Sequence, residues 1–199
     1  MPDDDSRDPP PPKPTASLDG VPDERVEVAP AGGGTYRVQL EGSFPTGWAG
    51  SLSLALARAQ IGIVSGVARK TGPRWWTVAI VVRPQSERAH PERVDYLALA
   101  HRRHPLVTAV PIDLTSFAVV ADETTGALLL EVTAPDRIGF LGSLLDRLAG
   151  LALFPEDMTI ETQDDLALDR FALKAPGGHA PSAEAHQALV TLLGDLRRA

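Results

Sequence analysis

The order of apolar and polar residues predicts a first run of alternating strands and helices. Apolar and polar residues alternate over 36–41, which is typical of a strand with one buried face. Apolar residues then recur at helical spacing over 48–59. Two segments rich in β-branched residues, 61–70 and 75–82, follow and predict strands joined by a turn. A shorter helix that begins with a proline is predicted over 91–102.

The same order of elements begins again after a turn at Gly126. A strand is predicted over 127–134 and a helix over 140–148, the latter because leucines and a phenylalanine recur every three or four residues. Two further strands are predicted over 157–162 and 167–174. A last helix is expected to begin at Ser182, a residue type that commonly caps helix N-termini.

The two runs can be superposed with a shift of 92 residues. Gly50-Ser51-Leu52 then falls on the identical Gly142-Ser143-Leu144. The repeated order strand–helix–strand–strand–helix is that of the split βαβ, or ferredoxin-like, unit. We therefore expect an α+β fold of two ferredoxin-like βαββαβ sandwiches in tandem, with antiparallel sheets and helices on one face.

The second run lacks a strand after its last helix, because the sequence ends with that helix. We expect one or two strands between 106 and 120. The last of these, 117–120, precedes the turn at 124–126 and is predicted to pair with residues 128–132 in place of the missing strand.

The first 34 residues differ in composition from the rest. They contain four consecutive prolines, eight acids against three bases, and three consecutive glycines at their end. Such a composition buries too little apolar surface to offset the entropy of ordering. We therefore predict a disordered tail over 1–34, a first domain over 35–113 and a second over 114–199.

Charge and cysteine content exclude several classes of protein. The chain has 19 Lys and Arg against 26 Asp and Glu, a net charge of −7, and no cysteine. A basic nucleic-acid footprint, a thiolate metal site and a cysteine nucleophile are therefore not expected. We also expect no membrane span, no secretory signal and a cytoplasmic location. Phosphate-binding, hydrolase and metal-ligand motifs are missing, so we expect no enzymatic activity, no cofactor and no metal.

Two adjacent tryptophans indicate that both faces of one strand carry apolar side chains. Trp75 and Trp76 point to opposite faces of a strand, so one can enter the core while the other lies on the open face of the sheet. An apolar open face favours a cover. We expect a protein partner or a second copy of the chain on the open face or at a sheet edge, with the tail as an alternative cover.

The start of the second run resembles a known family of small regulatory modules. Residues 130–141 combine an apolar strand, the motif Asp136-Arg137-Ile138-Gly139 and the start of a helix. This pattern resembles the opening of an ACT domain, and the whole body from 34 to 198 resembles the C-terminal tandem ACT region of bacterial PII uridylyltransferases. The catalytic motifs of those nucleotidyltransferases are missing, so the resemblance is to their sensory end.

The resemblance implies a ligand site where two ACT units meet. The candidate ligand-binding residues are Asp136, Arg137, Ile138, Gly139, Phe140 and Leu141. A glycine at a helix start lets a ligand approach backbone N–H groups, the helix N-terminus favours a carboxylate, and an aspartate can accept from an ammonium group. A free amino acid carries both groups. The alternative is that the aspartate caps the helix and the glycine relieves crowding.

The first run keeps the glycine of this motif and loses its charged pair, since Phe44-Pro45-Thr46-Gly47 occupies the equivalent positions. One strong site is therefore expected rather than two. The expected function is a non-catalytic allosteric sensor of a small amino acid, in nitrogen or amino-acid metabolism. The alternative is a protein–protein interaction or dimerisation module without ligand, similar to a stand-alone ACT transcriptional co-regulator such as the glycine-cleavage repressor.

Overall fold

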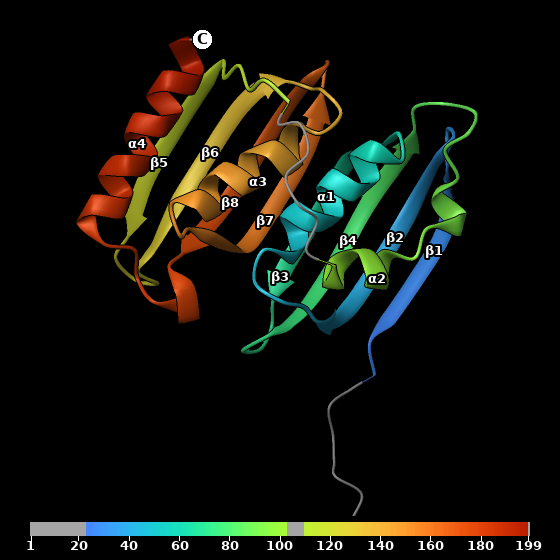
Figure 1. Cartoon of the computed structure of the whole chain (residues 1–199), viewed down its shortest axis with the longest axis horizontal. Coiled ribbons are helices and arrows are strands. Elements are labelled where there is room, and N and C mark those ends of the chain that lie inside the picture. Colours follow the sequence, from blue (N-terminus) through green and yellow to red (C-terminus); the bar gives the residue numbers. More distant parts are fainter. Residues whose placement is uncertain (1–22, 103–109, 199) are drawn as a thin grey trace, which may run out of the picture.

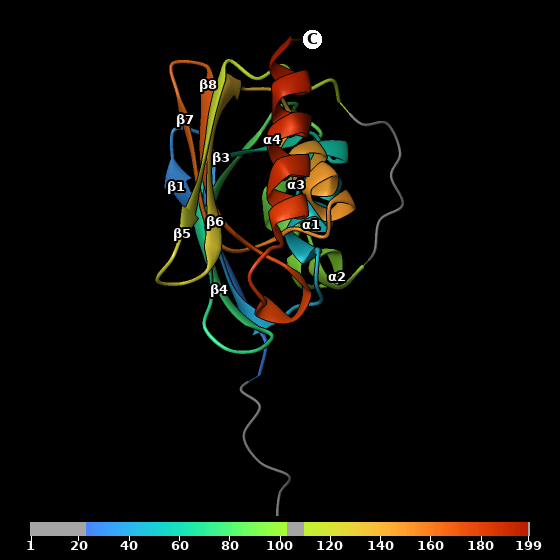
Figure 2. The same cartoon turned by 90° about the vertical axis from the view of Figure 1, so that its left-hand side faces the viewer.

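The structure, a computed structural model, describes residues 23–102 and 110–198 of the chain. These residues form one antiparallel sheet of eight strands, four α-helices and two short 3-10 helices. The α-helices all lie on the same face of the sheet, as Figures 1 and 2 show. An α+β fold with helices on one face is therefore confirmed.

The two halves of the described chain contain the same elements in the same order. The first half consists of β1 (Arg25–Gly32), β2 (Thr35–Ser43), α1 (Trp48–Arg58), β3 (Ile61–Lys70), β4 (Trp75–Pro84), a 3-10 helix (Pro91–Arg93) and α2 (Tyr96–His101). The second half consists of β5 (Ser116–Asp122), β6 (Ala127–Pro135), α3 (Phe140–Gly150), β7 (Phe154–Gln163), β8 (Leu166–Lys174), a 3-10 helix (Pro176–Gly178) and α4 (Ala183–Arg198).

The sheets of the two halves join edge to edge. The strand order is β1-β2-β4-β3-β7-β8-β6-β5, and the halves meet where β3 pairs antiparallel with β7. At the centre of this pairing, Val67 lies opposite Thr159, its equivalent after a shift of 92 residues. The chain therefore has an internal pseudo-twofold axis at the β3–β7 pairing. The expected separate sheets are in fact one continuous sheet, because each half offers its inner edge strand to the other.

The predicted order βαββαβ within each half differs from the observed order in one respect. Each half begins with the strand that a ferredoxin-like unit places last, so the order is strand–strand–helix–strand–strand–helix. For the second half this arrangement was predicted, and it is confirmed: Phe117 pairs with Val132 and Val120 pairs with Leu129. For the first half it was missed.

The prediction of a disordered tail over 1–34 was wrong for its last part. Residues 1–22 lie outside the described residues, but Arg25–Gly32 forms β1, which pairs antiparallel with β2. Its alternation of charged and valine residues places Val28 opposite the fully buried Val38. Gly32, Gly33 and Gly34 all have positive φ and form the turn into β2, so the glycines close a hairpin.

The second and fourth helices are formed as expected, with one break. Residues 91–102 are divided between the 3-10 helix and α2, because Asp95 caps α2 by accepting from the Ala98 N–H at 3.0 Å. Ser182 caps α4 by accepting from the Ala185 N–H at 3.2 Å, which confirms its predicted role.

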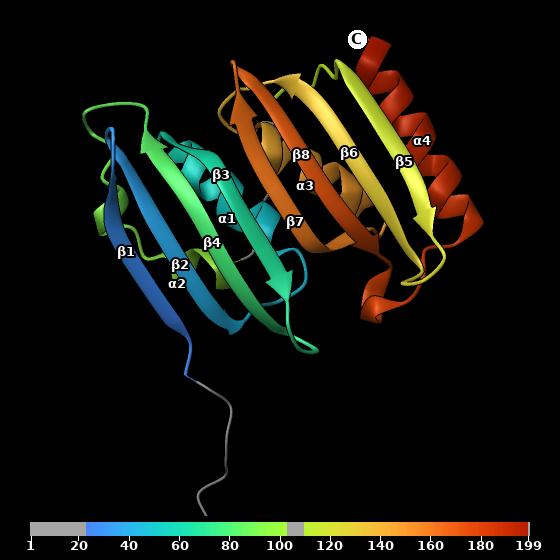
Figure 3. The ribbon, with the colours of Figure 1, turned by 180° about the vertical axis from the view of Figure 1, so that it is seen from behind.

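The adjacent tryptophans lie as predicted. Trp76 is 6% exposed and packs edge-on against Trp48 of α1, with ring centroids 5.2 Å apart. Trp75 lies on the opposite face, which Figure 3 shows without a covering helix. That face also carries the ion pair of Arg69 with Asp157, so its apolar residues are interrupted by charge. Nothing in the described part of the chain covers it, and the expected partner there stays a prediction.

None of the described helices has the length and apolar character that crossing a membrane requires.

Helices α1 and α3 approach closely, and this approach requires a glycine at Gly142 but not at its equivalent Gly50. A Cβ atom at Gly142 would lie 2.9 Å from the backbone nitrogen of Leu54, whereas one at Gly50 would meet Leu145 at an ordinary 3.5 Å. We expect Gly142→Ala to lower the free energy of unfolding by about 1–3 kcal/mol, because backbone must move. Thermal or urea unfolding measures this.

The matched control is Gly150→Ala in the same helix, where a Cβ atom would meet nothing within 4 Å. This change is expected to be neutral or slightly stabilising, because alanine is the better helix former. Equal stability of the two variants would contradict the close packing of α1 on α3.

Candidate functional site

The six residues proposed from sequence line one cavity. This cavity has a volume of about 510 Å³, and Asp136 to Leu141 form one wall of it at the start of α3. The opposite wall comes from the first half, from the end of α1 with Ala57 and from the first residues of β3. The volume lies in the range typical of small-molecule sites, about 300–1,000 Å³. Whether a ligand binds there stays a prediction.

The N-cap residue of α3 is Gly139, and the side chain of Asp136 does not cap the helix. Gly139 has φ +87°, a left-handed conformation that glycine adopts without strain. No side chain within residues 23–102 and 110–198 caps the helix, so the N–H groups of Leu141 and Gly142 in the first turn are left for other partners. The alternative of an aspartate cap is therefore wrong. A side chain at Gly139 would be strained with or without ligand, so Gly139→Val cannot report on ligand binding alone.

Asp136 and Arg137 have different surroundings. The backbone N–H of Asp136 donates to the carbonyl of Asp165 at 2.8 Å, and its Oδ2 accepts from the Thr162 hydroxyl at 3.2 Å. These contacts hold an exposed carboxylate at the rim of the cavity. Arg137 forms an ion pair with Asp113 at 3.1 Å, which orders the loop before α3. Of the charged pair, Asp136 is the residue available to a ligand.

The remaining candidates are apolar. Phe140 is 4% exposed and belongs to the hydrophobic core, and the half-buried Leu141 packs against that core. Ile138 is half-buried beside them. These three side chains contribute shape to the cavity wall and anchor the helix start, and they carry no hydrogen-bonding groups of their own.

The sequence prediction missed a further residue of this cavity, Asp169 of β8. Asp169 as a whole is 1% exposed, and neither oxygen of its carboxyl group has a hydrogen-bond partner in the described structure. It also lines the cavity. The signal was present in the strand: Ala167, Asp169, Phe171 and Leu173 alternate onto the buried face, so an acid falls where the pattern demands an apolar residue.

Burial raises the pKa of Asp169 from 3.8 to about 7, and the charge of Asp136 contributes to the rise. The backbone of Glu161 lowers the pKa of this carboxyl group and so opposes part of the rise, although the two groups do not have the geometry of a hydrogen bond. A buried acid without a partner is costly for a fold, and such groups cluster at functional sites. The cavity is therefore lined by an uncapped helix N-terminus, which attracts an anion, and by three aspartates, Asp136, Asp165 and Asp169, whose carboxyl groups attract a cation.

Metal binding finds no support in the arrangement of the described residues. Within 23–102 and 110–198, no three His, Asp or Glu side chains gather in the way a metal ion requires.

The pseudo-twofold axis places a second, different cavity at the start of α1. Phe44 there stands where Asp136 stands in the second half, and Gly47 is the left-handed N-cap of α1 as Gly139 is of α3. Val78 occupies the sheet position of Asp169, because it pairs with Leu40 as Asp169 pairs with Val132. The two cavities thus share a geometry and differ in chemistry.

Comparisons with known proteins give partial likenesses. No protein-family model matches the chain. The chain is 32% identical over 105 residues, 53% of its length and 20% of the relative, to a probable bifunctional tRNA threonylcarbamoyladenosine biosynthesis protein of Methanoculleus marisnigri. It is similar to the crystal structure of an aspartate kinase from Synechocystis, with a TM-score of 0.48 and 19% identity, over 82% of this chain and 27% of that one. The chain spans well under two thirds of either protein, and neither likeness assigns it a family.

Proposed function

We propose that this chain is a non-catalytic regulatory module that binds a small free amino acid in the cavity at the start of α3. The ACT-like sequence over 130–141 supports this function. The finer likeness to the C-terminal region of PII uridylyltransferases, with its link to nitrogen metabolism, stays a prediction.

The observation that carries the proposal is the buried, unpartnered carboxyl group of Asp169 in a cavity that also contains an uncapped helix N-terminus. An amino acid zwitterion has one anionic and one cationic group on adjacent atoms. Its carboxylate would accept from the N–H groups of Leu141 and Gly142, aided by the helix dipole. Its ammonium would donate to Asp136 and Asp169 and so satisfy a buried acceptor.

The position of the cavity supports a regulatory role. Its walls come from both halves of the chain, which join at β3–β7 and at α1–α3. A ligand that contacts both walls stabilises the arrangement in which they are closest and thereby shifts the population of the two halves toward it. A partner that senses the relative position of the halves would read this shift.

A pure interaction module is the second candidate. Its support is the face of the sheet opposite the helices, on which Trp75 and the 39% exposed Val67 lie without a cover from the described residues. This function requires no ligand, so the two candidates differ in their response to amino acids.

A thermal-shift screen of the free amino acids tests the proposal. A ligand at 100 times its dissociation constant is expected to stabilise the fold by about 2.7 kcal/mol, which is readily measured. Asp136→Asn is expected to weaken binding roughly tenfold or more, because a charged hydrogen bond is lost.

Ala57→Leu is the blocking variant, because Ala57 lies in the opposite wall, 3.6 Å from the position of a Cβ atom at Gly139. The matched control is Ala149→Leu, its equivalent in the second half, which lines the other cavity. No shift with any amino acid at millimolar concentration, or equal shifts in the Ala57→Leu variant, would leave the interaction module as the function.

A further inference from the structure

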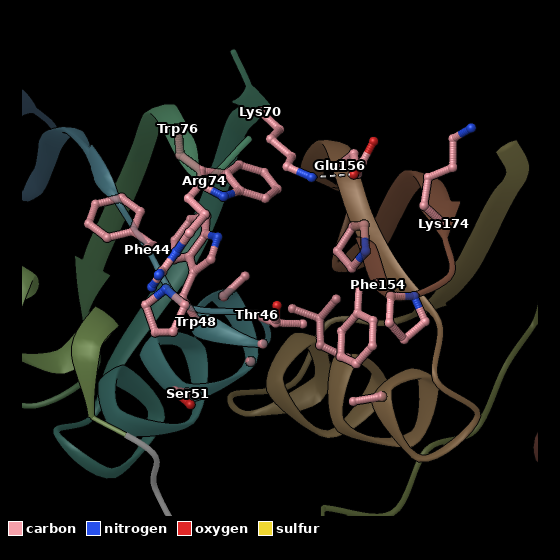
Figure 4. A pocket seen from close by; sticks show the side chains of 18 of the residues that line it. Phe44, Thr46, Trp48, Ser51, Lys70, Arg74, Trp76, Phe154, Glu156 and Lys174 are labelled. Carbon is pink, nitrogen blue, oxygen red and sulfur yellow. Dashed lines mark hydrogen bonds and ion pairs between the residues drawn. The ribbon is translucent and has the colours of Figure 1, made fainter. Parts of the chain in front are cut away.

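A second cavity between the two halves carries a chemistry of its own. It lies at the start of α1 and has a volume of about 140 Å³. Figure 4 shows Phe44, Trp48 and Trp76 of the first half on one side and Phe154 and Glu156 of the second half on the other. This cavity is distinct from the proposed amino-acid site, since it lies at the opposite ends of α1 and α3 and shares no lining residue with it.

The size and walls of this cavity suit one planar ring. An apolar cavity of about 150 Å³ in a protein holds a benzene molecule. Here the walls are aromatic: the rings of Phe44 and Trp48 lie 5.0 Å apart, and those of Trp48 and Trp76 lie 5.2 Å apart. Aromatic rings gain from offset or edge-on contact with a further ring, at centroid separations of about 4.5–7 Å. The cavity therefore favours a flat ring over an aliphatic group of the same volume.

The charges at the cavity favour an anion. Lys70 and Glu156 form an ion pair that joins β3 to β7, so their charges compensate each other. The Lys174 ammonium donates to the carbonyl of Thr125. Arg74 is exposed at the mouth, on the side of Trp48 and Trp76, and its guanidinium forms no hydrogen bond or ion pair with the described residues. A guanidinium binds a carboxylate through two parallel hydrogen bonds.

The cavity lacks the acids that make the other one suitable for an amino acid. Phe44 and Val78 replace Asp136 and Asp169 at the equivalent positions. The other acid in the lining is Asp146 of α3, where burial raises the pKa of the carboxyl group and the charge of Arg147 opposes the rise. The lining thus combines two acids with three basic residues, whereas the amino-acid cavity combines three aspartates with two arginines, so this cavity is the less suitable one for an ammonium group.

We propose that this second cavity binds an aromatic carboxylate with a single ring. The ring lies between the tryptophans of the first half and Phe154 of the second, and the carboxylate pairs with Arg74. Because residues of both halves enclose the ring, this ligand contacts both halves at their junction, as the proposed amino acid does. It does so at the opposite ends of α1 and α3.

Tryptophan fluorescence tests the proposal on the full chain. Trp48 and Trp76 line the cavity, whereas Trp75 lies on the bare face of the sheet, so Trp75→Phe removes the tryptophan outside the cavity. Phenylacetate is the probe, and it is expected to change the emission of this variant in a saturable way. Cyclohexylacetate, which has the same charge without a planar ring, and phenethylamine, which has the ring with the opposite charge, are both expected to bind at least roughly tenfold more weakly.

Two further substitutions locate the binding. Ala149→Leu, which enlarges a side chain in the lining of this cavity, is expected to abolish the response, and Ala57→Leu, in the lining of the other cavity, is expected to preserve it. Arg74→Gln is expected to weaken phenylacetate binding roughly tenfold or more. A thermal-unfolding curve confirms that each variant is folded.

The proposal is overturned if phenylacetate causes no saturable change, or if Ala149→Leu and Ala57→Leu respond alike. It is also overturned if phenylalanine binds more tightly than phenylacetate, because the cavity would then recognise an ammonium group. The amino-acid site is judged separately, since its blocking variant is Ala57→Leu.

Discussion

Deleting residues 1–34 is expected to lower the free energy of unfolding by about 3 kcal/mol or more, or roughly 6–12 °C in Tm for a chain of this size. The deletion removes β1, which pairs with β2 along its whole length. It also removes Glu24, whose carboxylate accepts from the Ser43 N–H at 3.1 Å and pairs with His101 at 2.8 Å. The edge of β2, which carries the fully buried Val38 and Leu40, would then be exposed to pairing with other chains.

A deletion that stops at residue 22 is the matched control, because it keeps every contact that the structure describes. It is expected to leave Tm unchanged. The composition of residues 1–34 by itself predicts that both deletions are harmless. An unchanged Tm after removal of all 34 residues, without aggregation in light scattering, would show that β1 does not contribute to the fold.

Asp169→Asn is expected to stabilise the protein at pH 8 and to change little at pH 4. The pKa of Asp169 is about 7 in the folded protein against an ordinary value of 3.8. Between these values the folded state holds a proton that the unfolded state has released, so stability falls as the pH rises from about 4 through 7. Each pKa unit corresponds to about 1.4 kcal/mol, so the loss in the native protein is on the order of 4 kcal/mol at most.

Urea unfolding of both proteins from pH 4 to 8 measures this difference. Asparagine cannot ionise, so the difference between variant and native protein grows with pH through that window. The matched control is Asp164→Asn, in the exposed turn before β8, where asparagine tolerates the positive φ of 51°. Parallel pH profiles of native protein and Asp169→Asn would mean that the carboxyl group is neither buried nor unpartnered.

The strand β1 shows why composition misled the prediction of a tail. Arg25-Val26-Glu27-Val28 alternates as a strand does, but prolines and three glycines surround it. Local composition counts these residues as breakers. In the structure the glycines supply the positive φ of a hairpin turn, and Pro30 lies beside a bulge at the edge of the sheet, where a missing N–H is tolerated.

Only part of the candidate site was predicted, because only part of it has a local signal in the sequence. The loop before α3 was found because glycine and charge stand together at a helix start, which is a local signal. Asp169 lies more than 25 residues further along the chain, and its alternation with Ala167 and Phe171 was visible. Only the pairing of β8 with β6 brings it beneath that loop, so no local pattern connects the two.

The sequence by itself determined the kind and order of most elements, the duplication with its shift of 92 residues, and the pairing of residues 117–120 with the following strand. These follow from hydrophobic periodicity and turn chemistry, which act between neighbouring residues. The tertiary structure alone decided that β3 pairs with β7, that α1 packs on α3, and that two cavities of different chemistry form at opposite ends of that contact. The reason is physical: edge pairing and helix packing depend on shape and burial between residues about 90 positions apart, which periodicity along the chain does not encode.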